Sequence, residues 1–212
     1  MLKISSIHVT ISSVQALRGF SLDLAAGSMV SLVGRNGAGK TSLMRTVMGH
    51  LPASGGSVSF DGADLARLPR HARAGLGIGY MPEDRGLVPE LTVEENILMP
   101  VWVSKNLKAD ERLTFVYRIL PELEAIRGRR ALLLSGGQQK MVALARALAV
   151  GTRLLLLDEP FEGLAPALSQ RLAEVVGALR GTQLAVLMSQ SDLNHSRSLV
   201  DREVVIERGA NA

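Results

Sequence analysis

Residues 34–41 read Gly-Arg-Asn-Gly-Ala-Gly-Lys-Thr, and this stretch decides the fold of the chain. An apolar run from Met29 to Val33 precedes it and predicts a buried strand, and a helical pattern from Lys40 to His50 follows it. A glycine-rich loop between a strand and a helix is the context in which the pattern G-x-x-x-x-G-K-[ST] binds phosphate. The sequence therefore predicts a nucleotide-binding α/β domain.

Each part of this loop has a chemical reason to hold an anion. Glycines let the backbone N–H groups curl toward a phosphate, and the helix start adds unpaired N–H groups and the positive end of the helix dipole. The Lys40 ammonium is a mobile point charge for the outer phosphates, and the Thr41 hydroxyl is a ligand for Mg²⁺. The candidate phosphate-binding residues are Gly34, Arg35, Asn36, Gly37, Ala38, Gly39, Lys40, Thr41 and Ser42.

The apolar run Leu154 to Leu157 ends in Asp158 and Glu159 and predicts the second half of a nucleotide site. If this strand lies parallel to the strand at 29–33, Asp158 comes beside the loop and can hold Mg²⁺ through water. Glu159 then lies at the exposed carboxyl end of the sheet, where it can orient and polarise the water that attacks a γ-phosphate. An ordinary acidic turn is the alternative, which the phosphate loop in the same chain disfavours.

A second glycine-rich element, Leu-Ser-Gly-Gly-Gln at 134–138, lies ahead of this acidic strand. It looks like another phosphate-binding helix start, an addition that few phosphate-loop proteins have. The pairing of the two elements indicates contacts to two nucleotides, one set of them offered to a partner.

The composition and the pattern of elements fit one domain of 212 residues with an inserted lobe. Continuous apolar strands that alternate with helices predict a mostly parallel sheet covered on both faces. The predicted strands are 2–10, 20–24, 29–33, 58–60, 154–158, 184–188 and 204–206, and the predicted helices are 40–50, 92–103, 110–120, 138–150 and 168–179.

Several classes of protein are disfavoured. The absence of cysteine excludes a disulfide framework and a thiolate metal site. The net charge is +4, but the arginines are scattered and the one cluster, at 127–130, has no interleaved aromatic residues as a single-strand binder would. Residues 1–14 alternate apolar and polar side chains, which predicts a strand and not a signal peptide. No apolar run is long enough to span a bilayer, so we expect a soluble chain that can dock on a membrane partner.

Taken together, GRNGAGKT, LSGGQ and LLLLDEP, in this order and spacing, resemble the ATP-binding subunit of an ABC transporter over nearly the whole chain. The stretches 81–97, 134–149 and 158–166 look like those of the branched-chain amino-acid (LIV-type) importers, and importers of amides and urea look similar. The resemblance implies a P-loop ATP hydrolase with a mostly parallel sheet, an N-terminal antiparallel β region and an inserted helical lobe. Its expected division is a single ABC ATPase domain over 1–212, with a RecA-like core at 1–84 and 151–212 and a helical signature lobe at 85–150.

The resemblance also implies a role for each candidate residue. Lys40 and its loop would bind the phosphates of ATP, Asp158 would serve Mg²⁺, and Glu159 would be the general base. Residues 161–165 would communicate across a dimer. The residues expected to cap the γ-phosphate held by the other subunit of a head-to-tail dimer are Ser135, Gly136, Gly137 and Gln138.

Three positions depart from the pattern of most relatives. Glu83 replaces a glutamine that senses Mg²⁺; it can bind the metal but cannot donate a hydrogen bond. Gln190 replaces a histidine; it can donate to a γ-phosphate oxygen but cannot titrate. The branched-chain importer group resembles the chain in both respects. His195 is either a displaced switch histidine or a solvated loop residue, and the second reading is favoured. The expected catalytic residues are thus Glu159, Gln190 and Lys40, and the expected metal ligands are Thr41, Glu83 and Asp158.

The third departure concerns the base of the nucleotide. Relatives usually stack adenine on an aromatic residue upstream of the phosphate loop, but residues 1–19 contain no Phe, Tyr or Trp, and the position falls near Ile11 to Ser13. Loss of this stacking costs on the order of 1 kcal/mol. We therefore expect weaker and less base-selective nucleotide binding than in relatives.

The resemblance further implies the partners and the location. We expect a second ABC ATPase subunit, either distinct or a second copy, together with transmembrane permease subunits that dock on the helical lobe and, indirectly, a substrate-binding protein. No nucleic-acid partner is expected. The chain would be cytoplasmic and peripheral on the inner face of the cell membrane. A soluble ABC-type ATPase acting on nucleic acid or ribosomes, and a nucleotide-gated module with little turnover, are the alternatives; the lack of long insertions and the presence of Glu159 disfavour them.

Overall fold

Two sheets organise the part of the chain that the computed structural model describes, residues 1–191 and 198–212. The larger has the strand order β10-β9-β3-β8-β7-β6, and the smaller has the order β2-β1-β4-β5. The strands are β1 (Leu2–Ile11), β2 (Val14–Leu24), β3 (Met29–Val33), β4 (Gly55–Phe60), β5 (Ala63–Asp64), β6 (Ile78–Met81), β7 (Leu154–Asp158), β8 (Ala185–Gln190), β9 (Arg202–Glu207) and β10 (Ala210–Asn211).

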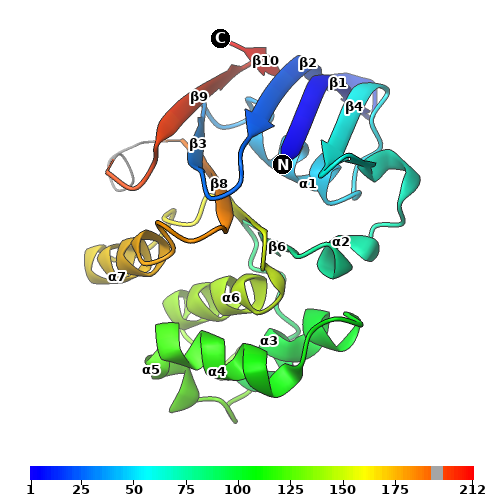
Figure 1. Cartoon of the computed structure of the whole chain (residues 1–212). Helices are drawn as coiled ribbons and strands as arrows, with labels where there is room; N and C mark the ends of the chain where they lie inside the picture. Colours follow the sequence, from blue (N-terminus) through cyan, green and yellow to red (C-terminus); the bar gives the residue numbers. More distant parts are fainter. Residues whose placement is uncertain (192–197) are drawn as a thin grey trace.

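The helices gather mainly at one end of the molecule. Figure 1 shows α3, α4, α5 and α6 at the opposite end from β1, β2 and β4. None of the described helices is both long enough and apolar enough to cross a membrane. The helices are α1 (Lys40–Val47), α2 (Ala72–Gly75), α3 (Val93–Trp102), α4 (Ala109–Ile119), α5 (Pro121–Glu124), α6 (Gly136–Val150) and α7 (Pro166–Gly177), with short 3-10 helices at Leu65–Arg67 and Ala131–Leu133.

The larger sheet is parallel from β9 to β6, as the continuous apolar strands predicted. Leu155 and Leu157 belong to the core that packs against α6 and α7, whereas Leu154 and Leu156 belong to the core shared with α1 and the smaller sheet. Every residue of β7 is buried because both faces are covered. The mostly parallel sheet, the antiparallel β region and the helical lobe confirm the predicted fold class.

The register of this sheet brings the ends of three strands together. Val33 of β3 pairs with Gln190 of β8, and Asp158 of β7 pairs with Ser189 of β8. The phosphate loop leaves β3 at this edge, so the loop and the acidic residues meet although they are far apart in the sequence.

The smaller sheet differs from the prediction at its first hairpin. The sequence pattern predicts a turn between strands 2–10 and 20–24, but β2 begins at Val14 and the turn is only Ser12 and Ser13, both with positive φ. The pairing of β1 with β2 contains three register shifts. Such bulges interrupt the alternation of side chains that marks a strand in a sequence, so the sequence pattern does not show the first part of β2.

Helix ends follow local capping chemistry. α6 begins at Gly136, two residues before the expected 138, because Ser135 and Gln138 form a capping box. A second capping box, made by Thr92 and Glu95, starts α3. α1 ends before the expected residue 50, and Gly49 with φ 76° follows it.

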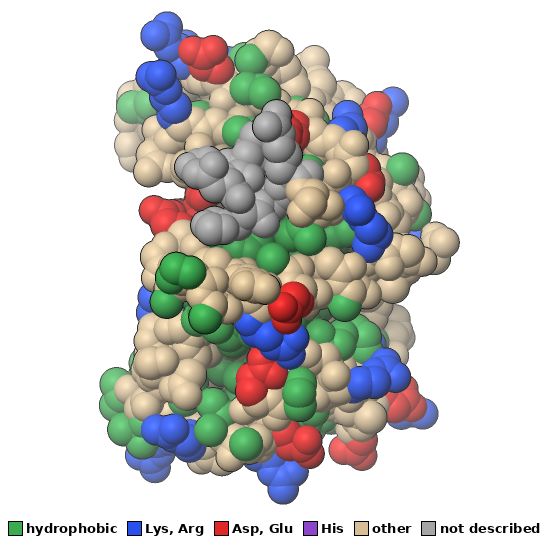
Figure 2. Space-filling view, turned by 90° about the vertical axis from the view of Figure 1, so that its left-hand side faces the viewer, with side chains coloured by type: hydrophobic (Ala, Val, Ile, Leu, Met, Phe, Trp, Pro, Cys, Tyr) green, Lys and Arg blue, Asp and Glu red, His purple; other side chains and the backbone are tan. Residues whose placement is uncertain are grey.

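On the face shown in Figure 2, the described basic and acidic side chains are interspersed and form no continuous basic surface.

Candidate nucleotide-binding site

The phosphate loop lies between β3 and α1 and holds the Lys40 side chain in the interior, where it is 5% exposed. Lys40 Nζ donates to Gly34 O at 2.5 Å and to Arg35 O at 3.2 Å. Gly39 has φ 112°, and a Cβ there would lie 2.8 Å from Ala16 O, so only glycine fits. The loop is therefore fixed by its own backbone and by β2.

Glu159 is bonded to the same loop. Lys40 Nζ lies 3.0 Å from Glu159 Oε1, and both side chains are buried. Ser191 donates its Oγ–H to Glu159 Oε1 at 2.6 Å and its N–H to Glu159 Oε2 at 3.2 Å. Ser191 Oγ also lies 2.8 Å from Asn36 Oδ1 of the loop. The structure thus brings the predicted base and the predicted phosphate ligand into direct contact.

Asp158 is fully buried beside Thr41, as the predicted parallel pairing required. Its carboxylate accepts hydrogen bonds from Ser189 Oγ at 2.6 Å, Thr41 Oγ1 at 3.2 Å and Tyr80 Oη at 3.4 Å. Burial raises the pKa of Asp158 despite these bonds, and burial together with Asp158 raises the pKa of Tyr80. Ser189 Oγ also accepts from the Glu159 N–H at 2.9 Å, so one hydroxyl positions both acidic residues.

Glu83 faces the same group of acids from the loop after β6. It lines the cavity that contains Lys40, Thr41 and Glu159. Desolvation raises the pKa of Glu83, and the carboxylates of Asp158, Glu162 and Glu159 raise it further. A hydroxyl and two carboxylates converge here, and oxygen ligands of this kind suit Mg²⁺.

The remaining predicted residues occupy two other places. Gln190 is buried at the end of β8, and its carbonyl accepts a hydrogen bond from Gly34 N at 3.1 Å. The signature stretch 135–138 forms the start of α6, with Ser135 and Gly136 exposed. Within the described chain, this stretch is not part of the cavity around Lys40. His195 lies outside the described residues.

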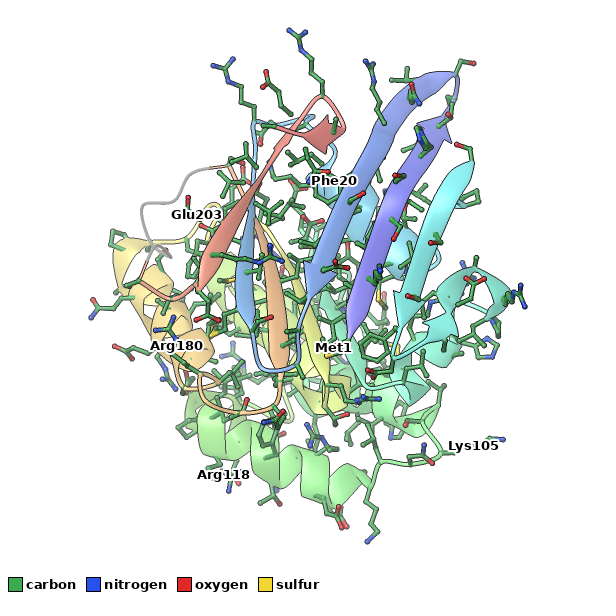
Figure 3. The ribbon with its side chains drawn as sticks, turned by 45° about the horizontal axis from the view of Figure 1, so that its top comes forward. Met1, Phe20, Lys105, Arg118, Arg180 and Glu203 are labelled. Carbon is green, nitrogen blue, oxygen red and sulfur yellow. The ribbon has the colours of Figure 1, made fainter. Side chains whose placement is uncertain are left out.

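The cavity around Lys40 measures about 560 Å³ and extends from the phosphate loop to β2. Its far wall starts at Val14, next to residues 11–13, which carry no aromatic side chain. The turn between β9 and β10 closes this end, and in Figure 3 that hairpin lies beside β2, near the labelled Phe20. Gly209 of the turn donates to Ala38 O at 2.9 Å. The lining residues are Val14, Gln15, Ala16, Arg18, Asn36, Gly37, Gly39, Lys40, Thr41, Ser42, Glu83, Glu159 and Arg208.

Sequence reasoning missed Tyr80, Ser189, Ser191 and Arg208. The two serines flank Gln190 at the carboxyl end of a buried strand, a position that favours functional polar residues in a parallel sheet. That signal was available in the sequence. Arg208 lies in a hairpin turn far along the chain, and only the fold places it at the cavity.

A phosphate loop, a buried aspartate and an adjacent glutamate at the strand ends of one parallel sheet define a P-loop nucleotide hydrolase. The profile of the ABC transporter family matches residues 17–162. The chain is 35% identical to the high-affinity branched-chain amino acid transport ATP-binding protein BraG of Pseudomonas aeruginosa, over 99% of this chain and 90% of BraG. It is 33% identical to the lipopolysaccharide export system ATP-binding protein LptB of Escherichia coli, over 89% of this chain and 79% of LptB.

Solved structures agree with these matches. The ADP conformation of an ATP-binding cassette of an ABC transporter has a TM-score of 0.82 and 27% identity, and the alignment covers 100% of this chain and 89% of that chain. A dimeric post-hydrolysis cassette bound to ADP and phosphate has a TM-score of 0.88 at 23% identity, covers 100% of this chain and 96% of that chain, and supports the fold alone.

The chain belongs to the ABC transporter family. It is an ATP-hydrolysing, ATP-binding subunit of a transporter, and its family implies a partner ATPase copy and a membrane permease.

Proposed function

We propose that this chain is the ATPase subunit of an importer for branched-chain amino acids or related amides or urea. The single observation that supports ATP turnover is the contact network of Lys40, Asp158 and Glu159 at one edge of the sheet. The similarity to BraG over almost the full length of both chains supports the importer type. The similarity to LptB favours a second candidate, an ATPase subunit of an exporter.

The residues of the phosphate end have distinct proposed roles. Residues 34–42 would bind the triphosphate of ATP, and Thr41, Asp158 and Glu83 would hold Mg²⁺. When bound, that cation would neutralise phosphate charge. Lys40 now donates to Gly34 O and pairs with Glu159; phosphate oxygens would replace these acceptors and leave the Glu159 carboxylate available to a water.

In the proposed reaction, the water oxygen forms a bond to the γ-phosphorus while the bond to the bridging oxygen of ADP breaks. The proton of that water passes to Glu159, which then acts as the general base. Ser191 and Ser189 fix the carboxylate and the backbone of Glu159 for this role. Gln190 would donate a hydrogen bond to an oxygen of the γ-phosphate.

The signature stretch has its proposed role in a partner's site. Ser135, Gly136, Gly137 and Gln138 open the 15-residue helix α6, whose start offers backbone N–H groups to an anion. These residues lie away from the chain's own Lys40 cavity. We propose that they cap the γ-phosphate held by a second cassette in a head-to-tail dimer. Residues 161–165 would contact that second cassette across the dimer.

A groove between core and lobe is the proposed site of permease docking. We propose that 1–84 and 151–212 form the core and 85–150 the signature lobe. A cavity of about 820 Å³ lies between them, with Met48 and Ile78 on one side and Met99 and Val103 on the other. Trp102, 58% exposed, stands at the end of α3 beside it. Glu83 also lines this groove, so a permease segment bound there would contact the loop that carries a proposed metal ligand.

Docking at this groove would place the chain on the cytoplasmic face of the membrane. Substitution of Val103 by Asp would weaken docking because a charge would enter an apolar wall. The expected result is loss of the chain from isolated membranes that contain the permease, with ATP binding retained. Equal membrane association of variant and wild type would contradict the proposed surface.

Transport measurements in the source cell test the proposed cargo. A chromosomal Lys40→Ala variant should lose uptake of labelled leucine, or of labelled urea or amide, because the phosphate contacts are removed. Normal uptake of all of these, together with a defect in lipopolysaccharide export, would instead support the second candidate.

A further inference from the structure

Lys140 is a buried cation on α6 that lies outside the recognised site residues. Its side chain is 3% exposed. Its ammonium donates to Glu159 O at 2.8 Å and to Glu162 O at 2.5 Å. Both acceptors are backbone carbonyls of the turn that follows β7.

Packing alone gives no reason for a charge at this position. Burial lowers the pKa of Lys140, which means that the interior disfavours its charged form. An apolar side chain would fill the same space without that cost. What Lys140 adds is two charge-assisted hydrogen bonds to one short stretch of backbone.

That stretch includes a residue in an unfavourable conformation. Glu159 has φ 45°, in the left-handed region that non-glycine residues rarely adopt. Such a conformation persists only when the surroundings hold it. The Glu159 N–H donates a hydrogen bond to Ser189 Oγ at 2.9 Å, and the Glu159 carbonyl accepts one from Lys140 Nζ at 2.8 Å. Both peptide groups of Glu159 are thus anchored, from β8 on one side and from α6 on the other.

We propose that Lys140 is a positioning residue that aims the Glu159 carboxylate at the attacking water. The inference rests on the proposed role of Glu159 as general base. Lys140 lies four residues, about one helical turn, after Gly136, the first residue of α6, so the helix that presents the signature to a partner also holds the chain's own general base in place. Movement of α6 on the partner's nucleotide would therefore reach Glu159 through one ammonium group.

Lys140→Met in the full chain tests this role. Without the two bonds the turn relaxes, and misplacement of a base by about 1 Å can reduce a rate up to about 100-fold. We expect kcat to fall at least about tenfold, with KM for ATP unchanged because the phosphate loop is untouched. The Glu159→Gln/Lys140→Met double variant should still form an ATP-dependent dimer on a sizing column.

The matched control is Arg112→Met. Arg112 also binds two carbonyls of α6, Ala149 O at 2.7 Å and Leu148 O at 2.8 Å, but at the end far from the signature. This variant should lose thermal stability and keep its kcat. If both variants lose kcat in proportion to Tm, Lys140 is merely structural and the proposal is wrong.

Lys140→Gln replaces Lys140→Met if the latter does not fold. The shorter amide cannot bridge both carbonyls, so kcat should fall by a smaller factor; a wild-type kcat would overturn the proposal. If Glu159→Gln abolishes turnover while the Lys140 variants keep it, the positioning role fails and the base assignment stands. If Glu159→Gln retains turnover, the proposed function itself is wrong.

Discussion

The two ends of the nucleotide cavity are built differently. At the phosphate end, Lys40 and Asp158 are buried and each binds several neighbours. At the base end, Val14 is 66% exposed, and the Arg208 side chain makes no hydrogen bond or ion pair with another described residue. Groups fixed in advance can be selective and catalytic, whereas exposed groups without fixed partners give weak and tolerant contacts. The chain should therefore recognise a triphosphate closely and its base loosely.

Removal of Glu159, the proposed general base at the phosphate end, should have the largest effect. Glu159→Gln is expected to lower kcat at least about 100-fold, because general-base catalysis contributes about that much or more. ATP binding and ATP-dependent dimers should persist. Phosphate release under saturating ATP is the measurement, and Glu90→Gln, an exposed carboxylate outside the cavity, is the control. Unchanged turnover in Glu159→Gln would mean that another residue is the general base.

Glu83 tests whether the metal is held by a second carboxylate. Glu83→Gln removes a negative charge beside Asp158 and should raise the Mg²⁺ concentration for half-maximal activity by about tenfold, a difference of about 1.4 kcal/mol. A Mg²⁺ titration at saturating ATP measures this. An unaltered titration curve would remove Glu83 from the metal site.

An aromatic residue at the nucleobase end of the cavity should strengthen nucleotide binding. Val14→Tyr supplies a ring for stacking and is expected to tighten ATP binding about fivefold, the effect of about 1 kcal/mol. Binding of ATP and GTP to the full chain can be compared by calorimetry. Val205→Tyr, on an exposed position of β9 outside the cavity, should change neither affinity. If Val14→Tyr also leaves the affinities for ATP and GTP unchanged, the nucleobase does not reach this wall of the cavity.

Arg208 should contribute a smaller, base-tolerant contact. A guanidinium can stack on any nucleobase, so Arg208→Ala should weaken the binding of ATP and of GTP by a similar factor of about three. The ratio of the two dissociation constants is the informative readout. Loss confined to one nucleotide would show that Arg208 reads base identity.

The buried Asp158 carboxylate at the phosphate end should lower the thermal stability of the nucleotide-free chain. The pKa of Asp158 is raised in the folded chain, so its ionised form destabilises the fold as pH rises through that pKa. Asp158→Asn should therefore raise the Tm of the nucleotide-free chain near neutral pH by about 2–4 °C, and the gain should shrink as pH falls. A lower Tm at all pH values would mean that the lost hydrogen bonds matter more than the removed charge.

Local sequence determined the phosphate loop, the acidic strand end and the signature helix start. Each is a short segment whose residues act together through backbone geometry or strand period, so neighbours in sequence suffice to recognise them. The apolar run 154–157 even predicted the burial of both faces of β7, because a strand covered on both faces has no polar side.

Only the tertiary structure decided which distant groups complete the site. Ser189 and Ser191 reach Asp158 and Glu159 because β8 pairs in register beside β7. Lys140 reaches the same turn because α6 packs under the sheet, and Arg208 reaches the cavity because its hairpin binds Ala38. Register and packing are set by the whole core, which no local pattern contains. The sequence thus determined which reactive groups the chain carries, and the fold decided which residues hold those groups in position.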